Sequence, residues 1–413
     1  MNAAIWLKDH IVNGHIRINE ENGTIDKIST TKTSRFNQKQ LQIDLKGKLV
    51  LPSFIDIHAH LRDFEENNKE TYETAAQAAA AGGFTTVFDM PNKKFPINSS
   101  KRLNIILEKA KKIEEAKIIP YILLSDKTDT ELLTEYPYVK AYLGPTIGGY
   151  ITDTTKIKDY LIKRINSILS IHCEDPKRIQ INLQEFPNIL ENHGRIRDAQ
   201  VELNAINKLL SVTNSIDTQT KVHIAHVSLL ESLNLIKSNK LSFEVTPHHL
   251  TLNNDDFLQL GVKGKMNPPL RPKKEQEKLW NSFLAGEIPI VSTDHAPHTL
   301  EEKIETELSG VPGLETCLPV LLNKLKPMTQ QKLSLIVSAL AINPRRLMNL
   351  PEKGIISEKE PANLTIIDFS KKKRVQPEDL KTKCKWSPWE NIELQGWPVL
   401  TIREGKITFN ELL

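Results

Sequence analysis

The chain has 413 residues, of which 39% are hydrophobic and 26% charged, a balance that is typical of a globular protein with a large core. The 55 basic and 51 acidic residues nearly cancel, so the charge does not indicate a nucleic-acid partner, and no window approaches the ~20 apolar residues of a membrane helix. Its three cysteines (Cys173, Cys317 and Cys384) are too far apart for a disulfide framework, and no signal peptide is visible, so we expect a cytoplasmic protein.

Both ends of the chain contain short strand-like pieces broken by turns. VNGHIRI and KGKLVLP lie in the first 52 residues, and KGIISEKEPANLTIIDF and LTIREGKITFN lie near the C-terminus. Alternating apolar residues between hairpin-like turns predict a β-rich domain. We therefore expect residues 1–51 and 350–413 to build one small β-sandwich together.

Residues 52–349 show a different pattern, in which short β-branched runs alternate with amphipathic segments. The predicted strands are residues 54–60, 85–90, 118–124, 138–143, 168–172, 222–226, 242–246 and 288–293. ETYETAAQAAAAGG, closed by glycine, and SSKRLNIILEKAKKIEEAK, with a serine available as N-cap, are typical of the helices between them. About eight such units predict an α/β fold, a (β/α)₈ TIM barrel over residues 52–349 inserted between the two terminal segments.

The first predicted strand ends in two histidines, within LPSFIDIHAHLRDF at residues 51–64. Alternate residues of a strand share one face, so Asp56, His58 and His60 are expected to point the same way. Two imidazoles above a carboxylate are typical of metal ligands with a supporting acid. A surface histidine pair is the alternative, and this motif alone does not separate the two interpretations.

Further candidates fall at the ends of later strands, where active sites lie in barrels of this kind. They are Lys140 in YVKAYLG, His172 in SIHCEDP, His226 in VHIAHVS, and Asp294, His295 and His298 in IVSTDHAPH. Each alone has an ordinary structural reading, as a hydrogen-bonded histidine or an ion-pair partner. Their coincidence at one end of the same barrel favours a site for two zinc-like ions with nitrogen and oxygen ligands.

Lys140 is the exception in this set, because an ammonium group would be repelled by metal cations. Reaction of its amine with carbon dioxide would give a carbamate, an anionic pair of oxygens able to bridge both metals. A covalent modification of this kind leaves no mark in a sequence.

Nine motifs occur in an order that resembles the dihydroorotase family of the amidohydrolase superfamily, in its long form with a carboxylated lysine. They are DIHAHLR, FDMPN, VKAYLG, IHCEDP, IAHVS, EVTPHHL, KMNPPLR, STDHAPH and GVPGLET, within a match over residues 44–367. The resemblance implies a hydrolase of cyclic amides that interconverts N-carbamoyl-L-aspartate and L-dihydroorotate in de novo pyrimidine (UMP) synthesis. The partners it implies are this small-molecule substrate and either further copies of the chain or aspartate transcarbamoylase, with no nucleic acid and no membrane.

The resemblance also assigns roles to individual residues. The implied cofactor is a pair of Zn²⁺ ions bridged by N6-carboxylated Lys140, with His58, His60 and Asp294 on one ion and His172 and His226 on the other. Asp294 is implied to move the proton between a metal-bridging hydroxide and the leaving nitrogen.

The implied substrate-binding residues are His60, Arg62, Asn92, Asn267, His298, Ser309 and Gly310. Among them Arg62, with Asn92 and His298, is implied to bind the substrate carboxylate, which suits a planar guanidinium. Asn267 is expected at the pyrimidine ring, and the segment around Ser309 and Gly310 is expected to supply backbone contacts.

Some positions depart from the family pattern or have no assigned role. Relatives usually continue EPG after the arginine, whereas this chain has DFE, so the course of that loop stays open. The glycines of residues 144–150 suit a mobile loop, in which Thr146 matches a threonine that some relatives place over the substrate. We interpret His248 and His249 as supporting or structural residues and Cys173 as a packing residue.

Two alternative functions remain open on the sequence. Dihydropyrimidinases, hydantoinases and allantoinases share the metal ligands, but the carboxylate-binding set favours a substrate that carries a carboxylate. A non-catalytic scaffold for a transcarbamoylase is the other alternative, and such chains have typically lost metal ligands that are all present here. The sequence does not determine metal identity, lysine carboxylation or oligomeric state.

Overall fold

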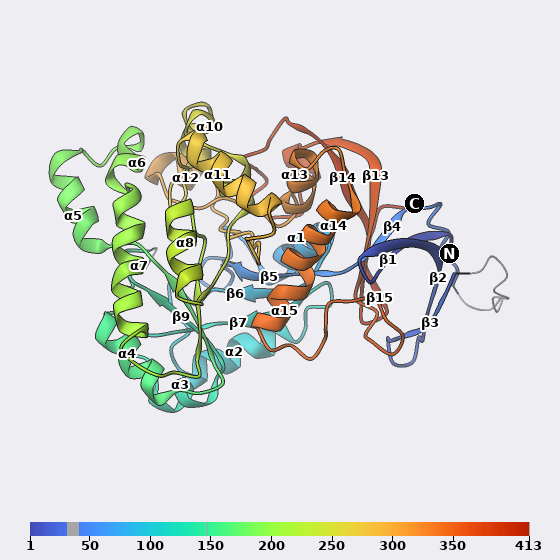
Figure 1. The fold of residues 1–413 in the computed structure, drawn as a ribbon, viewed down its shortest axis with the longest axis horizontal. Coiled ribbons are helices and arrows are strands. Elements are labelled where there is room, and N and C mark those ends of the chain that lie inside the picture. Colours follow the sequence, from blue (N-terminus) through green and yellow to red (C-terminus); the bar gives the residue numbers. More distant parts are fainter. Residues whose placement is uncertain (31–40, 147, 413) are drawn as a thin grey trace.

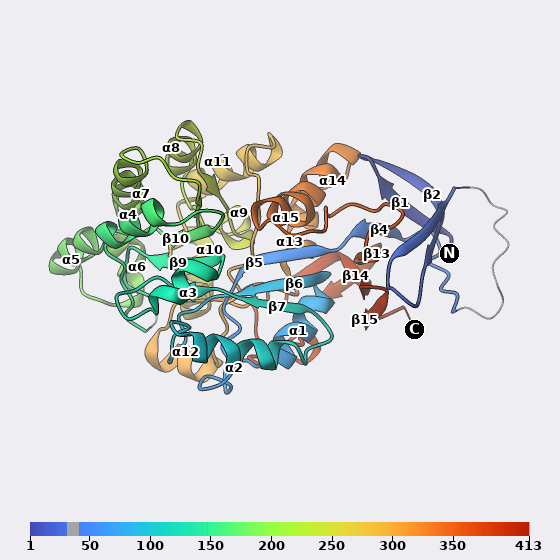
Figure 2. The ribbon, with the colours of Figure 1, turned by 90° about the horizontal axis from the view of Figure 1, so that it is seen from below.

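The computed structural model describes residues 1–30, 41–146 and 148–412. A barrel of strands surrounded by helices is joined at one end to a β-sheet, and both chain termini lie at the sheet end (Figure 1). Seen from below, strands β5, β6 and β7 run from the barrel towards that sheet (Figure 2).

The terminal sheet has seven strands in the order β15-β14-β13-β4-β1-β2-β3. They are β1 (Ala3–Leu7), β2 (His10–Ile18), β3 (Ile25–Ser29), β4 (Leu49–Pro52), β13 (Leu364–Arg374), β14 (Glu393–Arg403) and β15 (Lys406–Asn410). Val50 of β4 pairs with Ile5 on one side and with Ile366 on the other, and all three side chains are buried in one apolar cluster. The expectation that both chain ends build one β-structure is therefore confirmed.

The barrel strands follow the predicted positions within a few residues. They are β5 (Phe54–Ala59), β6 (Phe84–Asp89), β7 (Lys117–Pro120), β8 (Ile122–Leu123), β9 (Tyr138–Tyr142), β10 (Ile168–His172), β11 (Lys221–Ile224) and β12 (Ser242–Phe243). β7 and β8 are two parts of the third predicted strand, which pairs with β6 before Tyr121 and with β9 after it.

The barrel closes through the eighth predicted strand, residues 288–293. This segment and the residues directly after it form isolated parallel bridges instead of a continuous ladder, with Val291 opposite Val245 and His295 opposite Ala59 of β5. The parallel ladders β5-β6-β7 and β8-β9-β10-β11-β12 are thereby joined into a TIM-type barrel. The predicted fold class is confirmed.

Helices follow the strands and cover the outside of the barrel. They are α1 (Tyr72–Ala81), α2 (Ser100–Ala110), α3 (Thr130–Glu135), α4 (Thr154–Lys163), α5 (Pro176–Glu185), α6 (His193–Ile196), α7 (Ala199–Thr213), α8 (Leu230–Ser238), α9 (Pro247–Thr251), α10 (Asn254–Leu260), α11 (Lys273–Leu284), α12 (Leu300–Thr306), α13 (Cys317–Lys324), α14 (Gln330–Val337) and α15 (Asn343–Leu347). Ser99 caps α2, as its sequence predicts, by accepting a hydrogen bond from the backbone N–H of Arg102. None of the described helices has the length and apolar run that crossing a bilayer requires.

We propose that the domain division follows the sequence prediction, with residues 52–349 as the barrel and residues 1–51 and 350–413 as the β-domain. Leu51 still pairs with β13 of the terminal sheet, whereas Phe54 already pairs with Phe84 of the barrel. Pro52 also pairs with Leu364 of that sheet, so Ser53 alone lies between these pairings, and the barrel begins directly where the sheet ends.

Candidate active site

Two histidines and an aspartate converge at the carboxyl end of the barrel. The Nε2 atoms of His58 and His60 lie 3.4 and 3.1 Å from the same oxygen, Oδ1 of Asp294. These three donor atoms lie within 4.8 Å of one another, and the described residues contain no other group of three that meets this criterion. Nitrogen and oxygen donors without cysteine suit a divalent metal such as zinc, so the residues fit the predicted metal.

Hydrogen bonds on the far side of each ring orient this histidine pair. Nδ1 of His58 lies 2.5 Å from Oε1 of Glu244, and Nδ1 of His60 lies 2.8 Å from Oδ1 of Asn92. Because these oxygens accept the Nδ1 proton, the Nε2 lone pairs face Asp294. Burial, and then the nearby Lys140, lower the pKa of His58 to about 4, which leaves its imidazole neutral and able to bind a cation.

Glu244 is a site residue that the sequence interpretation missed, since it expected Asp56 to be the supporting acid. Asp56 instead accepts hydrogen bonds from the backbone N–H groups of His58 and Thr293, at 3.0 and 3.2 Å. Glu244 follows β12 and also binds Nε2 of His223 at 3.2 Å. Its position within the predicted strand 242–246, as the first residue of the EVTPHHL motif, was the available signal.

The second predicted ligand pair, His172 and His226, also meets in the barrel. Nδ1 of His172 lies 2.8 Å from Nε2 of His226, while Nε2 of His172 lies 2.9 Å from a carboxylate oxygen of Glu174. The buried Nδ1 of His226 has no hydrogen-bond partner among the described residues. Because Glu174 accepts the Nε2 proton, the Nδ1 lone pair of His172 faces His226, an arrangement that suits two rings sharing a cation. The rings of His58 and His226 are 5.3 Å apart, so the two pairs are neighbours.

Lys140 lies in β9 and is completely buried. Its ammonium donates one hydrogen bond, to Oγ of Ser170 at 3.3 Å, and lies 5.4 Å from the centroid of the Tyr142 ring. An ammonium offers three donors, so this environment satisfies it poorly. Burial lowers the pKa of Lys140 to about 8, which increases the fraction of neutral amine.

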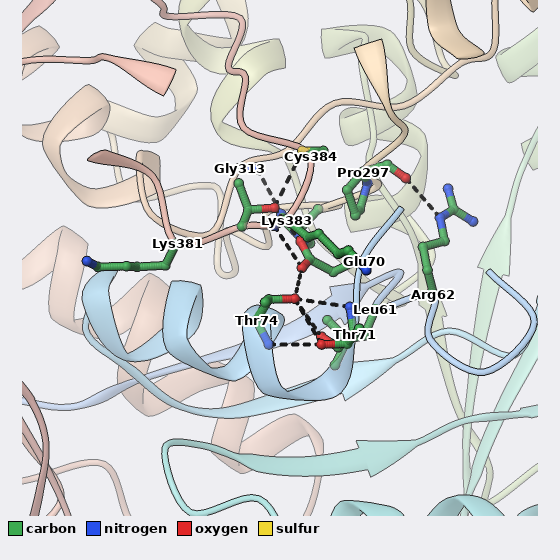
Figure 3. A network of polar contacts seen from close by, with 12 residues as sticks. Leu61, Arg62, Glu70, Thr71, Thr74, Pro297, Gly313, Lys381, Lys383 and Cys384 are labelled. Atoms are coloured by element: carbon green, nitrogen blue, oxygen red, sulfur yellow. Dashed lines mark hydrogen bonds and ion pairs between the residues drawn. The ribbon is translucent and has the colours of Figure 1, made fainter. Parts of the chain in front are cut away.

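Arg62 and His298 form a second buried pair beside the cleft. Nη2 of Arg62 lies 3.2 Å from Nε2 of His298. Nε of Arg62 donates to the backbone oxygen of Pro297 at 3.2 Å, as Figure 3 shows. Burial, and then the guanidinium, lower the pKa of His298 far below its usual value, so a neutral His298 accepts from Arg62. Arg62 has a backbone φ of 54°, and Asp63 and Phe64 share this left-handed conformation. The loop that lacks the family's turn glycine thus turns through three residues of positive φ.

One polar cleft collects most of the predicted site residues. It is lined by His58, His60, Arg62, Asn92, Tyr142, Thr146, His172, His226, Asn267, Asp294, Ala296, Ser309 and Gly310. Lys140 and His298 do not line it and instead lie behind it, next to Ser170 and Arg62 respectively. Tyr142 was not predicted, although it lies two residues after Lys140, on the same face of β9.

Internal hydrogen bonds hold the polar side chains on the substrate side of the cleft. Nδ2 of Asn92 donates to Oγ1 of Thr146 at 3.1 Å, and Oγ of Ser309 donates to Oδ1 of Asn267 at 3.1 Å. Gly310 has a φ of 130°, and a Cβ there would lie 2.7 Å from the backbone oxygen of Ala296. A side chain at this position would therefore clash, which explains the glycine. Ile147, in the predicted mobile loop, lies outside the described residues.

His249 and Cys173 have structural contacts, whereas the buried Nε2 of His248 has no hydrogen-bond partner among the described residues. His249 bonds through Nδ1 to Oγ1 of Thr246 at 2.8 Å and through Nε2 to the oxygen of Pro268 at 3.0 Å. Cys173 is buried, with Sγ 3.8 Å from the backbone oxygen of Ile171. These contacts agree with their interpretation as structural and packing residues.

Known proteins resemble this chain along nearly its whole length. The model of the amidohydrolase family matches residues 49–408. Dihydroorotase from Pyrococcus furiosus is 34% identical over 411 residues, which cover 98% of this chain and 91% of that protein. Dihydroorotase from Bacillus cytotoxicus is 32% identical over 396 residues, with 89% of each chain covered.

Among solved structures, L-hydantoinase (dihydropyrimidinase) from Arthrobacter aurescens shares the fold, with a TM-score of 0.89 at 23% identity over 99% of this chain and 95% of that chain. This likeness concerns the fold, and the higher sequence identities concern the family. The family match covers most of the chain, and relatives above 30% identity extend over almost all of it. The chain therefore belongs to the amidohydrolase family, among the dihydroorotases.

Proposed function

We propose that this protein catalyses the reversible cyclisation of N-carbamoyl-L-aspartate to L-dihydroorotate, a step of de novo pyrimidine synthesis. The observation that carries the proposal is the buried Arg62–His298 pair beside a cleft where metal-type ligands converge. An arginine next to a hydrolytic centre suits a cyclic amide that bears a carboxylate. The relatives named dihydroorotase support the same reaction.

We further infer that the cleft holds two zinc ions. The ligands we propose are His58, His60 and Asp294 for one ion, His172 and His226 for the other, and N6-carboxylated Lys140 between them. When bound, the ions activate water and polarise the substrate carbonyl. The poorly satisfied ammonium of Lys140 supports its conversion to an anionic carbamate, since a bare cation would oppose metal binding.

In this proposal Asp294 moves the proton of the reaction. Its carboxylate faces both His58 and His60, and burial raises its pKa above the usual value. In the hydrolytic direction Asp294 takes the proton from the attacking water and delivers it to the ring nitrogen that leaves. In the direction of ring closure it takes the proton from that nitrogen and returns it to the water that departs.

The substrate is oriented by the opposite side of the cleft. We propose that Arg62, supported by Asn92 and His298, binds the carboxylate, and that Asn267 contacts the ring. Ser309 and Gly310 supply contacts beside it, where the glycine allows close approach of the backbone. His60 borders the substrate as well as the metal.

From the resemblance we also propose that the chain forms a homo-oligomer or a complex with aspartate transcarbamoylase. The size of the purified protein, measured alone and mixed with that transcarbamoylase, would test both.

A substrate panel tests this function, with purified, metal-analysed protein and a variant that removes the guanidinium. Wild-type protein should hydrolyse dihydroorotate in preference to dihydrouracil, hydantoin and allantoin. Arg62→Met should lower kcat/KM for dihydroorotate by about 30- to 1000-fold, because a charge-assisted bond to the carboxylate contributes roughly 2–4 kcal/mol. Residual activity on dihydrouracil, which lacks that carboxylate, should barely change.

The control for this variant is Arg178→Met, which removes an arginine paired with Asp198 on the surface. It should behave as wild type, and zinc content should be the same in all three proteins. A wild-type preference for dihydrouracil, or an equal loss on both rings in Arg62→Met, would replace the proposed function by a hydantoinase-like one.

Glu244→Gln is expected to weaken zinc binding by about 10- to 100-fold, the usual effect of losing a carboxylate that orients a ligating histidine. The amide retains the shape of Glu244 but loses the charge that faces both His58 and His223. Competition with a zinc chelator measures the affinity, and the melting temperature of the metal-free protein shows whether folding is affected. Glu315→Gln, a buried carboxylate bound by the backbone of Lys381 and Thr382, is the control. Equal zinc affinity in both variants would contradict the role of Glu244.

A further inference from the structure

The segment between β13 and β14 leaves the terminal sheet and reaches the carboxyl end of the barrel. We call residues 380–387 the C-terminal strap. Figure 3 shows part of it, Lys381 to Cys384, lying beside Glu70 and near the loop that carries Arg62. The contacts of this strap lead to three separate loops on the substrate side of the cleft.

The first contact is with Glu70, whose side chain is completely buried. One carboxylate oxygen accepts from the backbone N–H of Lys383 at 2.9 Å, and the other accepts from Oγ1 of Thr382. The backbone oxygen of Glu70 accepts from the N–H of Asp63 at 3.1 Å, directly after Arg62. The strap is therefore hydrogen-bonded to Glu70, and the backbone of Glu70 closes the loop that carries Arg62.

The second contact is with the backbone of His298. Trp386 is 1% exposed, and its indole N–H donates to the backbone oxygen of His298 at 2.8 Å. The side chain of His298 in turn bonds Arg62. The strap thus reaches both members of the Arg62–His298 pair, Arg62 through Glu70 and His298 through Trp386.

The third contact runs through Lys303 of α12. Its ammonium lies 5.4 Å from the centroid of the Trp386 ring. The same ammonium donates to three backbone oxygens, those of Lys265, Leu308 and Gly310, at 3.0, 2.7 and 2.8 Å. Leu308 and Gly310 flank Ser309, and Lys265 lies just before Asn267. Through Trp386, the strap therefore packs against the Lys303 ammonium, which joins the segment of Ser309 to that of Asn267.

We propose that the C-terminal strap is a positioning element for substrate recognition, which holds Arg62 and His298 at the spacing that the substrate carboxylate requires. The inference rests on the proposed function for the identity of that substrate. The predicted metal ligands are supported by other residues, namely Asn92, Glu174 and Glu244. Loosening the strap should therefore impair carboxylate recognition without releasing metal.

The test combines two substitutions, Thr382→Val and Trp386→Phe, which remove the side-chain hydrogen bonds of the strap to Glu70 and to the backbone of His298. The double variant is expected to lower kcat/KM for dihydroorotate at least about 10-fold, mainly through KM, because small misplacement of a binding group is costly. Residual activity on dihydrouracil and zinc content should stay close to wild type. Trp389→Phe is the matched control, since Trp389 is buried in the same apolar cluster and no hydrogen bond joins its indole to His298 in the described structure.

Two further measurements separate positioning from a general loss of structure. In an Arg62→Met background the strap substitutions should cause no additional loss on dihydroorotate, because the group they position is gone. Hydrogen–deuterium exchange of the backbone around Arg62 and His298 should be faster in the double variant than in Trp389→Phe. Equal losses on both substrates, full additivity with Arg62→Met, or unchanged exchange would each overturn the proposal. Turnover of dihydroorotate by the wild-type protein tests the proposed function separately. If the wild type does not turn it over, the hydrogen–deuterium exchange comparison still tests whether the strap positions Arg62 and His298.

Discussion

Replacement of Lys140 by alanine is expected to abolish turnover of dihydroorotate. The lysine is completely buried, and its ammonium has little hydrogen bonding to compensate for its charge. If it carries a carbamate, the substitution removes two anionic oxygens that hold the metals. Zinc content should then fall below the value of about two ions per chain that the two-metal proposal predicts for the wild type.

Chemical rescue distinguishes the loss of an anion from misfolding. A small carboxylic acid fits the gap left in Lys140→Ala and should restore part of the zinc content and activity by supplying the missing oxygens. The same acid should do nothing for Arg62→Met, whose metal ligands are intact. Density for an unmodified lysine in a crystal that is fully metallated and active would contradict the carbamate.

Asp294→Asn is expected to reduce kcat by about 100-fold or more, the usual range for loss of a general base. Asparagine preserves the shape and keeps an oxygen towards His58 and His60, but it cannot accept and return a proton. Because the proton transfer belongs to the transition state, the loss should appear in kcat more than in KM. The measurement is the pair of kinetic constants in both directions, with zinc content determined on the same samples.

Asp198→Asn provides the comparison for this variant, since Asp198 caps α7 and pairs with Arg178 on the surface. Asparagine is an equally good cap, so turnover should remain at the wild-type level. If Asp294→Asn with full zinc content also kept near-wild-type turnover, the base would have to lie elsewhere in the cleft.

The two sides of the cleft depend on different parts of the chain. The supports of the predicted metal ligands, such as Asn92 and Glu244, follow barrel strands. The supports of the substrate side come in part from the C-terminal strap, which belongs to the segment that also forms the terminal sheet. Metal affinity and substrate discrimination should therefore respond to different substitutions.

The sequence by itself determined the barrel, the terminal sheet and the alignment of the candidate ligands. Strand and helix periods are local properties of the backbone, so alternating segments reveal the architecture without any distance information. His58 and His60 share a strand face for the same reason, and Lys140 and His172 follow from their positions in later strands. Barrel geometry then brings the carboxyl ends of these strands together.

Only the tertiary structure decided which groups support these residues. Asp56 is two residues from His58, yet the ring is held by Glu244, 186 positions away. Trp386 bonds the backbone of His298 across 88 positions, and nothing in the local pattern of either segment indicates this contact. The division of the third strand at Tyr121 was equally hidden, because it depends on which neighbours the strand meets. Periodicity records the face on which a side chain lies, whereas a hydrogen bond between distant segments depends on how whole elements pack against each other, and that is set by the three-dimensional fold.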